Sequence, residues 1–393
     1  MLKKKNIFIL IIMIVFLLLS GCSGKPNGEG ASSEPFFVNC DSDFVKHGDI
    51  IYFYEGGLSS EPDSKLRFLD VSTGECMPLC GKPDCMHNGA DCNASVNATG
   101  FIRLMLYNGR LFWIESGSPE FILYSIKTDG TDRRKELTLD DELYSLAYGE
   151  GTAEIHEGVL YVCGSASRVS DGRPSIVCAV FSQPLDGGEA KLIYRSDERA
   201  FIFGKICGDI LYFAESEMWP DSDDNSDKPL VLKLFSYNTK TEELAELYRD
   251  ERANAYYRYL LAADDILYLA GYQTAAVFSP ADKSFSHYRS DNNMAMDIGE
   301  GIMLRWESPN SYLCSDLNGV PLFHGTYPPE GLSGQPFGKI YIGSSNNKFY
   351  YYACLAPDDW SSENWYIMEF DLETHETKVL WEHEVKFDEQ FSR

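Results

Sequence analysis

The sequence predicts an all-β protein, a β-propeller built of seven four-stranded blades. A turn followed by an aliphatic–aromatic strand recurs along the chain, as in Gly48–Phe53 and Gly208–Phe213. The anchors of successive copies lie about 36–60 residues apart, which overlaps the repeat length of propeller blades. After residue 35, no segment has the apolar period of an amphipathic helix. Six or eight blades, or another all-β fold, are the alternatives. The anchor residues are Ile51, Leu111, Leu160, Leu211, Leu267, Met303 and Phe349.

Each copy predicts the four strands of one blade. A first strand precedes most anchors, for example at Phe201–Ile206, and the anchor belongs to the second strand. The third strand alternates apolar and polar residues, as in Leu232–Tyr237, and the turn Asn238–Lys240 leads to a polar fourth strand. A small sheet of this kind buries both faces only against its neighbours, so the blades are expected to close into a ring. The sequence reveals no strand exchanged between the first and last blades.

The start of the chain predicts a lipoprotein signal peptide over residues 1–21. A basic start at Lys3–Lys5 is followed by an apolar run at Ile7–Leu19 and by small residues before Cys22. The run of about 13 residues is shorter than the roughly 20 that span a bilayer, although an uncleaved signal anchor is the alternative. Leu19-Ser20-Gly21-Cys22 resembles the bacterial lipobox, which implies lipidation of Cys22.

This anchor predicts the place and the layout of the protein. We expect a cell-membrane location on the extracytoplasmic face, with the membrane as a partner through the lipid. Residues 22–35 are rich in Gly, Ser and Pro and predict a flexible tether. Residues 36–393 then form the propeller.

The charge of the chain excludes some partners. The chain has 60 acidic and 34 basic residues, which gives a net charge of −26. Nucleic acids and anionic lipid surfaces favour Lys/Arg patches, so neither is expected to bind. A strongly acidic surface keeps an exported protein soluble.

A cysteine- and histidine-rich insert at residues 76–94 is the sharpest local feature. Thiolates and imidazole are the usual zinc ligands, and four of these side chains would complete a tetrahedral site. The spacing Cys-x4-Cys-x-His-x4-Cys is not that of a standard zinc motif. Two disulfides, expected outside the cytoplasm, and reduced structural thiols are the alternatives. The residues of this metal or disulfide site are Cys76, Cys80, Cys85, His87 and Cys92, of which all but Cys76 form the zinc set.

The signal, the repeats and the segment Leu79–Ala94 together resemble a group of uncharacterised β-propeller lipoproteins of Gram-positive anaerobes. In that group a similar Cys/His segment follows the first blade. The resemblance implies a cell-surface propeller and brings no established activity with it.

Two weaker signals concern other side chains. Asp221, Asp223, Asn225 and Asp227 begin like a calcium-binding loop, but Ser226 replaces its glycine and Leu232 its bidentate glutamate. A solvated acidic loop is the alternative. Cys163 and Cys178 are expected on adjacent strands, where they could pair or stay buried as thiols.

The function predicted from the sequence is that of a non-catalytic binding or scaffolding module for a glycan, peptide or protein ligand. Serine hydrolase, zinc protease and P-loop motifs are missing from the sequence. An extracellular enzyme that cleaves glycans or peptides at the propeller funnel is the alternative. Metal or redox handling through the Cys/His insert, with zinc as the metal, is the second alternative.

Overall fold

The computed structural model gives the chain as two units, Met1–Glu34 and Pro35–Arg393, and all the described residues belong to the second. The predicted signal peptide, the predicted tether, Cys22 and the calcium candidate at 221–227 lie outside the described residues. The described residues are 44–55, 65–97, 102–117, 120–139, 150–170, 173–196, 198–217, 230–251, 256–263, 266–272, 274–289, 296–299, 302–308, 311–316, 320–326, 332–345, 347–356 and 362–386.

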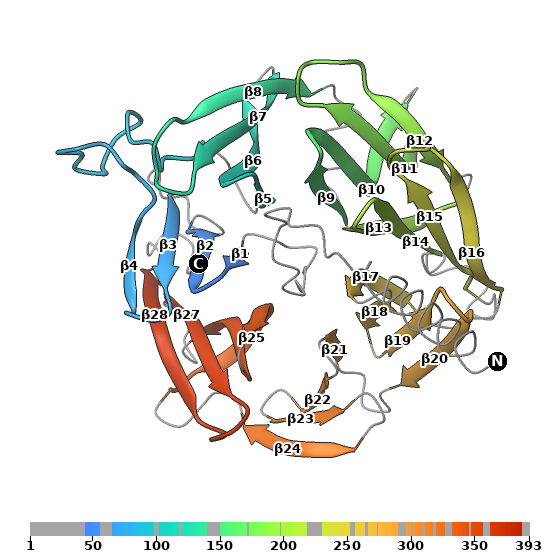
Figure 1. Cartoon of the computed structure of the whole chain (residues 1–393). Coiled ribbons are helices and arrows are strands. Elements are labelled where there is room, and N and C mark those ends of the chain that lie inside the picture. Colours follow the sequence, from blue (N-terminus) through green and yellow to red (C-terminus); the bar gives the residue numbers. More distant parts are fainter. Residues whose placement is uncertain are drawn as a thin grey trace, which may run out of the picture. The chain divides into compact units, whose positions relative to one another are not determined.

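Twenty-eight strands form seven four-stranded antiparallel sheets, each made of consecutive strands (Figure 1). Blade 1 is β1–β4, and the count continues in fours to blade 7, β25–β28. The first four blades consist of β1 Phe44–His47, β2 Ile50–Tyr54, β3 Leu66–Asp70, β4 Glu75–Pro78, β5 Met105–Tyr107, β6 Arg110–Gly117, β7 Glu120–Lys127, β8 Arg134–Leu139, β9 Glu150–His156, β10 Val159–Ser170, β11 Arg173–Pro184, β12 Lys191–Arg195, β13 Ala200–Cys207, β14 Ile210–Glu217, β15 Leu232–Asn238 and β16 Leu244–Asp250. The other three consist of β17 Tyr256–Ala263, β18 Ile266–Tyr272, β19 Thr274–Ser279, β20 Ser284–Arg289, β21 Met296–Gly299, β22 Ile302–Ser308, β23 Ser311–Asp316, β24 Pro321–Thr326, β25 Gln335–Ser345, β26 Lys348–Ala356, β27 Ser362–Asp371 and β28 Thr377–Lys386.

The predicted all-β propeller fold is confirmed, and each sequence anchor lies on the second strand of its sheet. The turn before the anchor explains the recurring glycine. Asn108 and Gly109 have φ values of +47° and +68°, and Glu157 and Gly158 have +48° and +76°. Two successive left-handed residues make the tight hairpin turn whose twist matches that of the flanking strands. No helix among the described residues is long and apolar enough to span a membrane.

Among the described side chains, neighbouring sheets pack on each other through alternate residues of a strand. In blade 2, Leu111 and Trp113 pack with the buried residues of blade 1. Phe112 and Ile114, one position along, pack against Leu160 and the rest of the blade 3 face. Because successive side chains of a strand point to opposite faces, one strand serves two interfaces.

The ring closes between blade 7 and blade 1 by side-chain packing. Ile51 and Ile367 lie in one buried cluster that joins the two blades. The ring of Phe53 contacts that of Trp381 at 5.0 Å between centroids. All four strands of blade 1 and all four of blade 7 come from one continuous segment each, so no strand is exchanged among the described residues.

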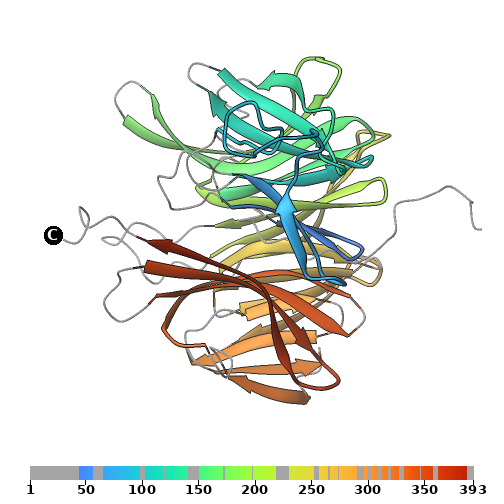
Figure 2. The same cartoon turned by 90° about the vertical axis from the view of Figure 1, so that its left-hand side faces the viewer.

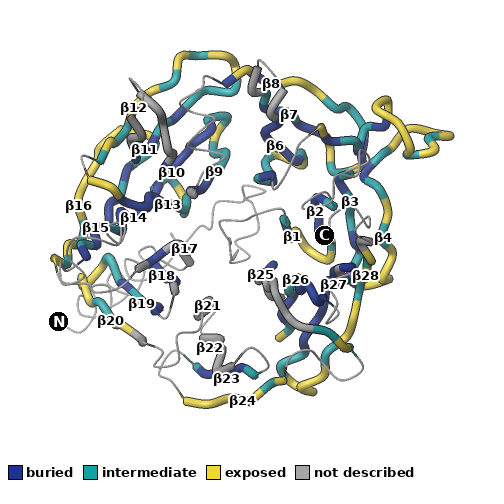
Figure 3. The backbone as a smooth tube through the Cα atoms, turned by 180° about the vertical axis from the view of Figure 1, so that it is seen from behind, coloured by how far each residue is buried: buried dark blue, intermediate teal, exposed yellow. Residues whose placement is uncertain are grey.

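The two faces of the ring differ in their connections. At one end of the strands, two-residue turns join the first and second strands, as at 108–109 and 208–209. The other end carries longer connections, including 55–65, 140–149 and 218–231. The long hairpin of β10 and β11 also extends toward this end (Figure 2). Exposed residues otherwise follow the outer strands, while the blade interfaces are buried (Figure 3).

A buried glutamate joins blades 3 and 4. Glu215 lies on β14, four residues after the anchor, and is 3% exposed. Lys233 on the neighbouring strand places Nζ 2.5 Å from its carboxylate. The hydroxyl of Tyr194, on the outer strand of blade 3, donates a hydrogen bond to the same carboxylate. One acidic side chain thus satisfies a cation of its own blade and a hydroxyl of the preceding blade.

The same position carries a glutamate in blades 1 and 2. The carboxylate of Glu55 lies 2.7 Å from Arg67 Nε and 3.7 Å from Nδ1 of His383 on the outer strand of blade 7. Glu115 is 5% exposed and accepts a hydrogen bond of 2.9 Å from Arg133. A glutamate four residues after the anchor therefore recurs at the interfaces between neighbouring blades, here called joints.

Cys163 and Cys178 do not face each other across the sheet. Cys163 pairs in register with Val180, and Cys178 with Ser165, so the two thiols are diagonal neighbours. Both are buried free thiols, and burial raises the pKa of Cys163.

We expect Glu215→Ala to lower the free energy of unfolding by about 3–5 kcal/mol, because it leaves the largely buried, partly exposed Lys233 ammonium without its carboxylate. Urea denaturation followed by tryptophan fluorescence measures this change. Glu246→Ala is the control, since it breaks an exposed pair with Arg249 and is expected to cost less than about 1 kcal/mol. Equal effects of the two substitutions would show that the buried glutamate does not stabilise the joint.

Candidate metal centre

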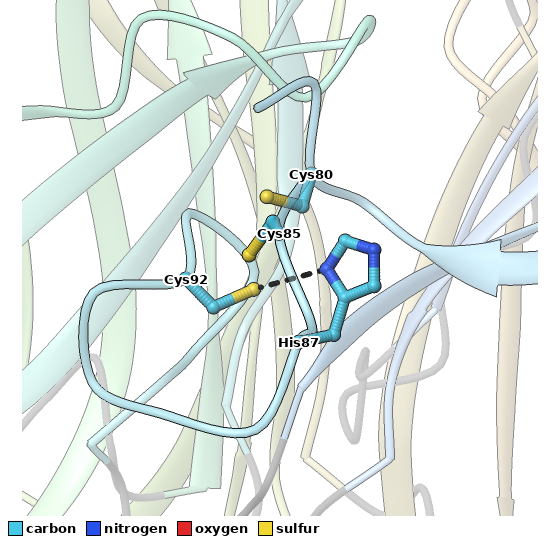
Figure 4. Close-up of side chains that lie close together, drawn as sticks. All are labelled: Cys80, Cys85, His87 and Cys92. Atoms are coloured by element: carbon cyan, nitrogen blue, oxygen red, sulfur yellow. Dashed lines mark hydrogen bonds between the residues drawn. The ribbon is translucent and has the colours of Figure 1, made fainter. Parts of the chain in front are cut away.

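The connection between blades 1 and 2 brings three cysteines and one histidine to a single point on the outer rim. The ligating atoms of Cys80, Cys85, His87 and Cys92 all lie within 4.8 Å of one another (Figure 4). His87 Nδ1 is 3.5 Å from the sulfur of Cys92. Cys92 is buried, and the other three side chains are partly exposed. Three sulfurs and one imidazole nitrogen are a recognised ligand set for a structural zinc ion.

Cys76, the fifth residue of the predicted site, lies apart from this cluster. It belongs to β4, pairs in register with Leu69 and packs against the core between blades 1 and 7. Burial raises the pKa of its thiol to about 11, although the nearby Arg67 opposes the rise. The structure thus brings together four of the five predicted side chains.

Two left-handed residues shape the loop that carries the ligands. Asp84 and His87 have φ values of +58° and +56°. Residues with a side chain rarely adopt this conformation, so the surrounding structure must hold it. Cys85 and His87 both point toward the other two ligands in Figure 4, whereas Met86 between them is 80% exposed. The backbone here therefore directs Cys85 and His87 toward the cluster and leaves Met86 in solvent.

Close backbone contact fixes the loop to blade 2. The amide of Gly81 donates to the carbonyl oxygen of Gly130 at 2.9 Å, and Asn93 Nδ2 donates to the same oxygen at 2.9 Å. A Cβ atom on Gly130 would lie 2.6 Å from the nitrogen of Gly81 and 2.7 Å from that of Cys80. Only glycine permits this approach. The sequence marks residues 128–130 as a turn, but it gives no sign that the turn supports the cysteine loop.

Blade 1 and the joint itself hold the two ends of the loop. The amide of Leu79 donates to the carbonyl of Leu66 at 2.9 Å, and the amide of Leu66 donates to the carbonyl of Ala94 at 2.8 Å. Leu79 and Ala94 are fully buried. Arg133 of blade 2, which pairs with the buried Glu115, also donates to the carbonyl of Ser95. The cluster is therefore mounted across the joint between blades 1 and 2.

Backbone amides donate to the sulfurs of Cys80 and Cys92, and in Cys80 they outweigh the effect of burial. Burial alone would raise the pKa of Cys80, but hydrogen bonds from the amides of Lys82 and Asn93 and from the neighbouring thiols outweigh it and lower the pKa. For Cys92, burial dominates and raises the pKa to about 11, while the amide of Ala94 opposes the rise. Donors to sulfur stabilise the negative charge that a metal ligand needs.

Cys80, Cys85 and Cys92 are free thiols. A disulfide within the cluster would use two of its three sulfurs and leave the third sulfur and the imidazole without a role. A single tetrahedral ion would use all four groups. The arrangement can therefore hold a metal ion with no further protein ligand.

A second group of potential ligands differs from this cluster. His156, Glu157 and Asp209 also place ligand atoms within 4.8 Å of one another, on turns of blades 3 and 4. Lys240 Nζ lies 2.8 Å from Asp209 and 3.6 Å from Glu157. Because this ammonium group neutralises the acids, the group is an ion-pair cluster.

The fold is similar to that of solved propeller-type proteins. A variant of puromycin hydrolase in complex with PGG aligns with a TM-score of 0.55 and 11% identity, over 88% of this chain and 54% of that chain. A second puromycin hydrolase structure gives 0.54 and 12%, over 89% and 57%. A protein from Lactobacillus plantarum gives 0.50 and 12%, over 87% and 97%.

These similarities show the fold alone. The chain spans about half the length of puromycin hydrolase. No protein-family model and no curated protein sequence matches the chain.

We expect Gly130→Ala to destabilise the protein by about 1–3 kcal/mol more than Gly74→Ala, because its Cβ would force the cysteine loop off blade 2. The two glycines have nearly the same φ, +77° and +76°, but a Cβ on Gly74 would meet nothing within 4 Å. The backbone strain is therefore shared and the difference reports the contact. Chemical denaturation measures it, and equal losses would contradict the close docking.

Proposed function

We propose that this chain is a lipid-anchored, extracytoplasmic propeller that binds a glycan, peptide or protein ligand without chemical conversion. The asymmetry of the ring carries this proposal. The connections on one face are two to six residues long, whereas the other face includes connections of ten or more residues, among them 55–65 and 218–231. Loops that project from a rigid scaffold are the usual place for binding residues, so the face with the long connections is the proposed ligand surface.

The proposal of a membrane anchor is based on the sequence. Cys22 follows a basic and apolar leader, and residues 22–35 supply a short polar tether. Two or more acyl chains would hold the chain stably on the membrane. The net charge of −26 opposes direct docking of the ring on anionic lipids, so the tether would hold the propeller away from the bilayer.

An extracellular enzyme that cleaves glycans or peptides is the competing function. Propellers host both binding proteins and enzymes, so the fold does not decide between them. The two classes differ in an observable way, because only an enzyme releases product from a bound substrate.

The test uses Cys22→Ala, which lacks the acceptor thiol. We expect this variant to leave the membrane fraction, where the wild-type chain stays. The soluble variant is then applied to glycan and peptide arrays, and saturable binding with no change in the mass of the bound glycan or peptide is expected. Cleaved product would favour the enzyme, and a membrane-bound Cys22→Ala chain would contradict the lipid anchor.

We further propose that Cys80, Cys85, His87 and Cys92 hold a zinc ion that braces the joint between blades 1 and 2. Four protein ligands leave no position for water or substrate, which is typical of structural zinc sites. The amides that donate to the sulfurs supply the outer contacts that orient and stabilise such ligands. This closed ligand set favours a brace over metal transfer or redox chemistry.

We expect one equivalent of zinc in protein purified under reducing conditions, measured by elemental analysis. Cys92→Ser is expected to lose most of the metal, since it removes a ligand. Cys76→Ser is the control and is expected to keep it, because Cys76 lies outside the cluster. A strong chelator should lower the unfolding midpoint of the wild-type chain. Metal-free protein with a disulfide inside the cluster would overturn the zinc proposal.

A further inference from the structure

The Cys/His cluster places oxidisable sulfurs at the joint between two blades. Cys80, Cys85 and Cys92 are free thiols, and their sulfurs lie within 4.8 Å of one another. In Figure 4 the three sulfurs point toward one another. Two sulfurs must approach to about 2 Å to form a disulfide, so a movement of about 3 Å at most is enough.

Solvent reaches the cluster through two of these sulfurs. The side chains of Cys80 and Cys85 are partly exposed, whereas Cys92 is 3% exposed. The surrounding stretches 81–84 and 88–91 are exposed as well. A small oxidant therefore meets Cys80 or Cys85 first and finds a second sulfur beside it. Redox-active cysteines commonly combine an accessible thiolate with a neighbouring thiol that completes the disulfide.

The loop that carries Cys85 is held in a strained conformation. Asp84, directly before it, and His87, two residues after it, have φ values of +58° and +56°, although neither is a glycine. Such residues persist only where their surroundings hold them. Loss of a metal ion would remove part of that support, and the loop could relax to an ordinary backbone conformation.

A chain of contacts connects the cluster to the interior of the joint. The amide of Ser95 donates to the carbonyl of Cys92 at 3.1 Å, and the carbonyl of Ser95 accepts from Arg133. The guanidinium of Arg133 lies 5.3 Å from the ring centroid of Trp113, which is fully buried. A change in the cluster can therefore alter how blades 1 and 2 meet.

We propose that the metal centre is an oxidation-sensitive brace. A peroxide converts Cys80 and Cys85 to a disulfide, and the zinc ion leaves the joint. This inference rests on the zinc site proposed above, because zinc holds its cysteine ligands as thiolates. After oxidation only Cys92 and His87 remain as ligands, which is two fewer than a structural zinc site uses.

The reaction balances with hydrogen peroxide as the oxidant. One thiolate attacks the O–O bond, becomes a sulfenic acid and releases hydroxide. The second thiolate attacks the sulfenic sulfur, forms the S–S bond and releases a second hydroxide. The two sulfurs give up two electrons, the peroxide is reduced by them, and two protons from the solvent convert the hydroxides to water.

The experiment adds hydrogen peroxide stepwise to the zinc-loaded full chain in a mild detergent and follows released zinc with a coloured chelating dye. We expect one zinc ion to be released for each disulfide formed, and peptide mapping by mass spectrometry to join Cys80 to Cys85. A thiol reductant and added zinc should restore the metal. The unfolding midpoint of the oxidised protein should fall to that of the chelator-treated protein.

Met86→Leu is the matched control. Met86 is 80% exposed and its thioether can also be oxidised, but it is not a ligand, so this variant should release zinc as the wild-type chain does. The buried Cys163 and Cys178, 2% and 1% exposed, should stay reduced in both chains.

Two results would overturn the proposal. One is a zinc-loaded chain that consumes peroxide and keeps its metal, and the other is release of zinc without a disulfide between Cys80 and Cys85. A chain that holds no zinc when purified under reducing conditions overturns the zinc site itself, and with it this inference. The two failures are distinct, because the metal content is measured before peroxide is added.

Discussion

Each sheet of this protein is apolar on both faces, and no blade can bury both of them alone. The structure meets this constraint by closing the ring. Blade 2 uses Trp113 toward blade 1 and Phe112 toward blade 3, and the contact of Phe53 with Trp381 completes the circle. Because no strand is exchanged there among the described residues, side-chain packing must stabilise the closure. Every other feature lies on a frame that exists only when all the joints are made.

Several buried or partly buried polar groups lie at the joints between blades. Glu55, Glu115 and Glu215 occupy one position of the repeat, and each forms an ion pair with a cation of its own blade. The Cys/His cluster lies at the joint between blades 1 and 2, where Arg133 pairs with Glu115 and donates to the carbonyl of Ser95. A metal ion there would act on the contact between two blades rather than within one. Since burial of a charge is costly unless it is paired, these polar groups fix how neighbouring sheets meet.

Local patterns made most of the fold predictable. The turn and the anchor strand are adjacent in sequence, so all seven anchors could be placed on second strands. Four of the five candidate ligands fall within 13 residues, and their spacing was enough to group them. Cys76 lies apart from the cluster because it pairs with Leu69 in the sheet of blade 1. Gly130 of blade 2 supports the cysteine loop through a contact between segments far apart in the sequence. Neither feature has a local signal in the sequence. The repeated glutamates were visible four residues after the anchor, but the contacts of Glu55 with His383 and of Glu215 with Tyr194 on the preceding blades were not.

The continuity of each blade has a consequence for how the protein is made. The strand pairing within a sheet of four consecutive strands can begin as soon as its own segment has been synthesised, although its faces stay exposed until the neighbouring sheets arrive. Blade 1 is then the first to form, but its partner on one side is the last segment of the chain to appear. Ile51 and Phe53 must wait, exposed to water, until residues 335–386 arrive. The period of greatest vulnerability to aggregation is therefore the synthesis of the last blade, when the largest open ring still lacks one sheet.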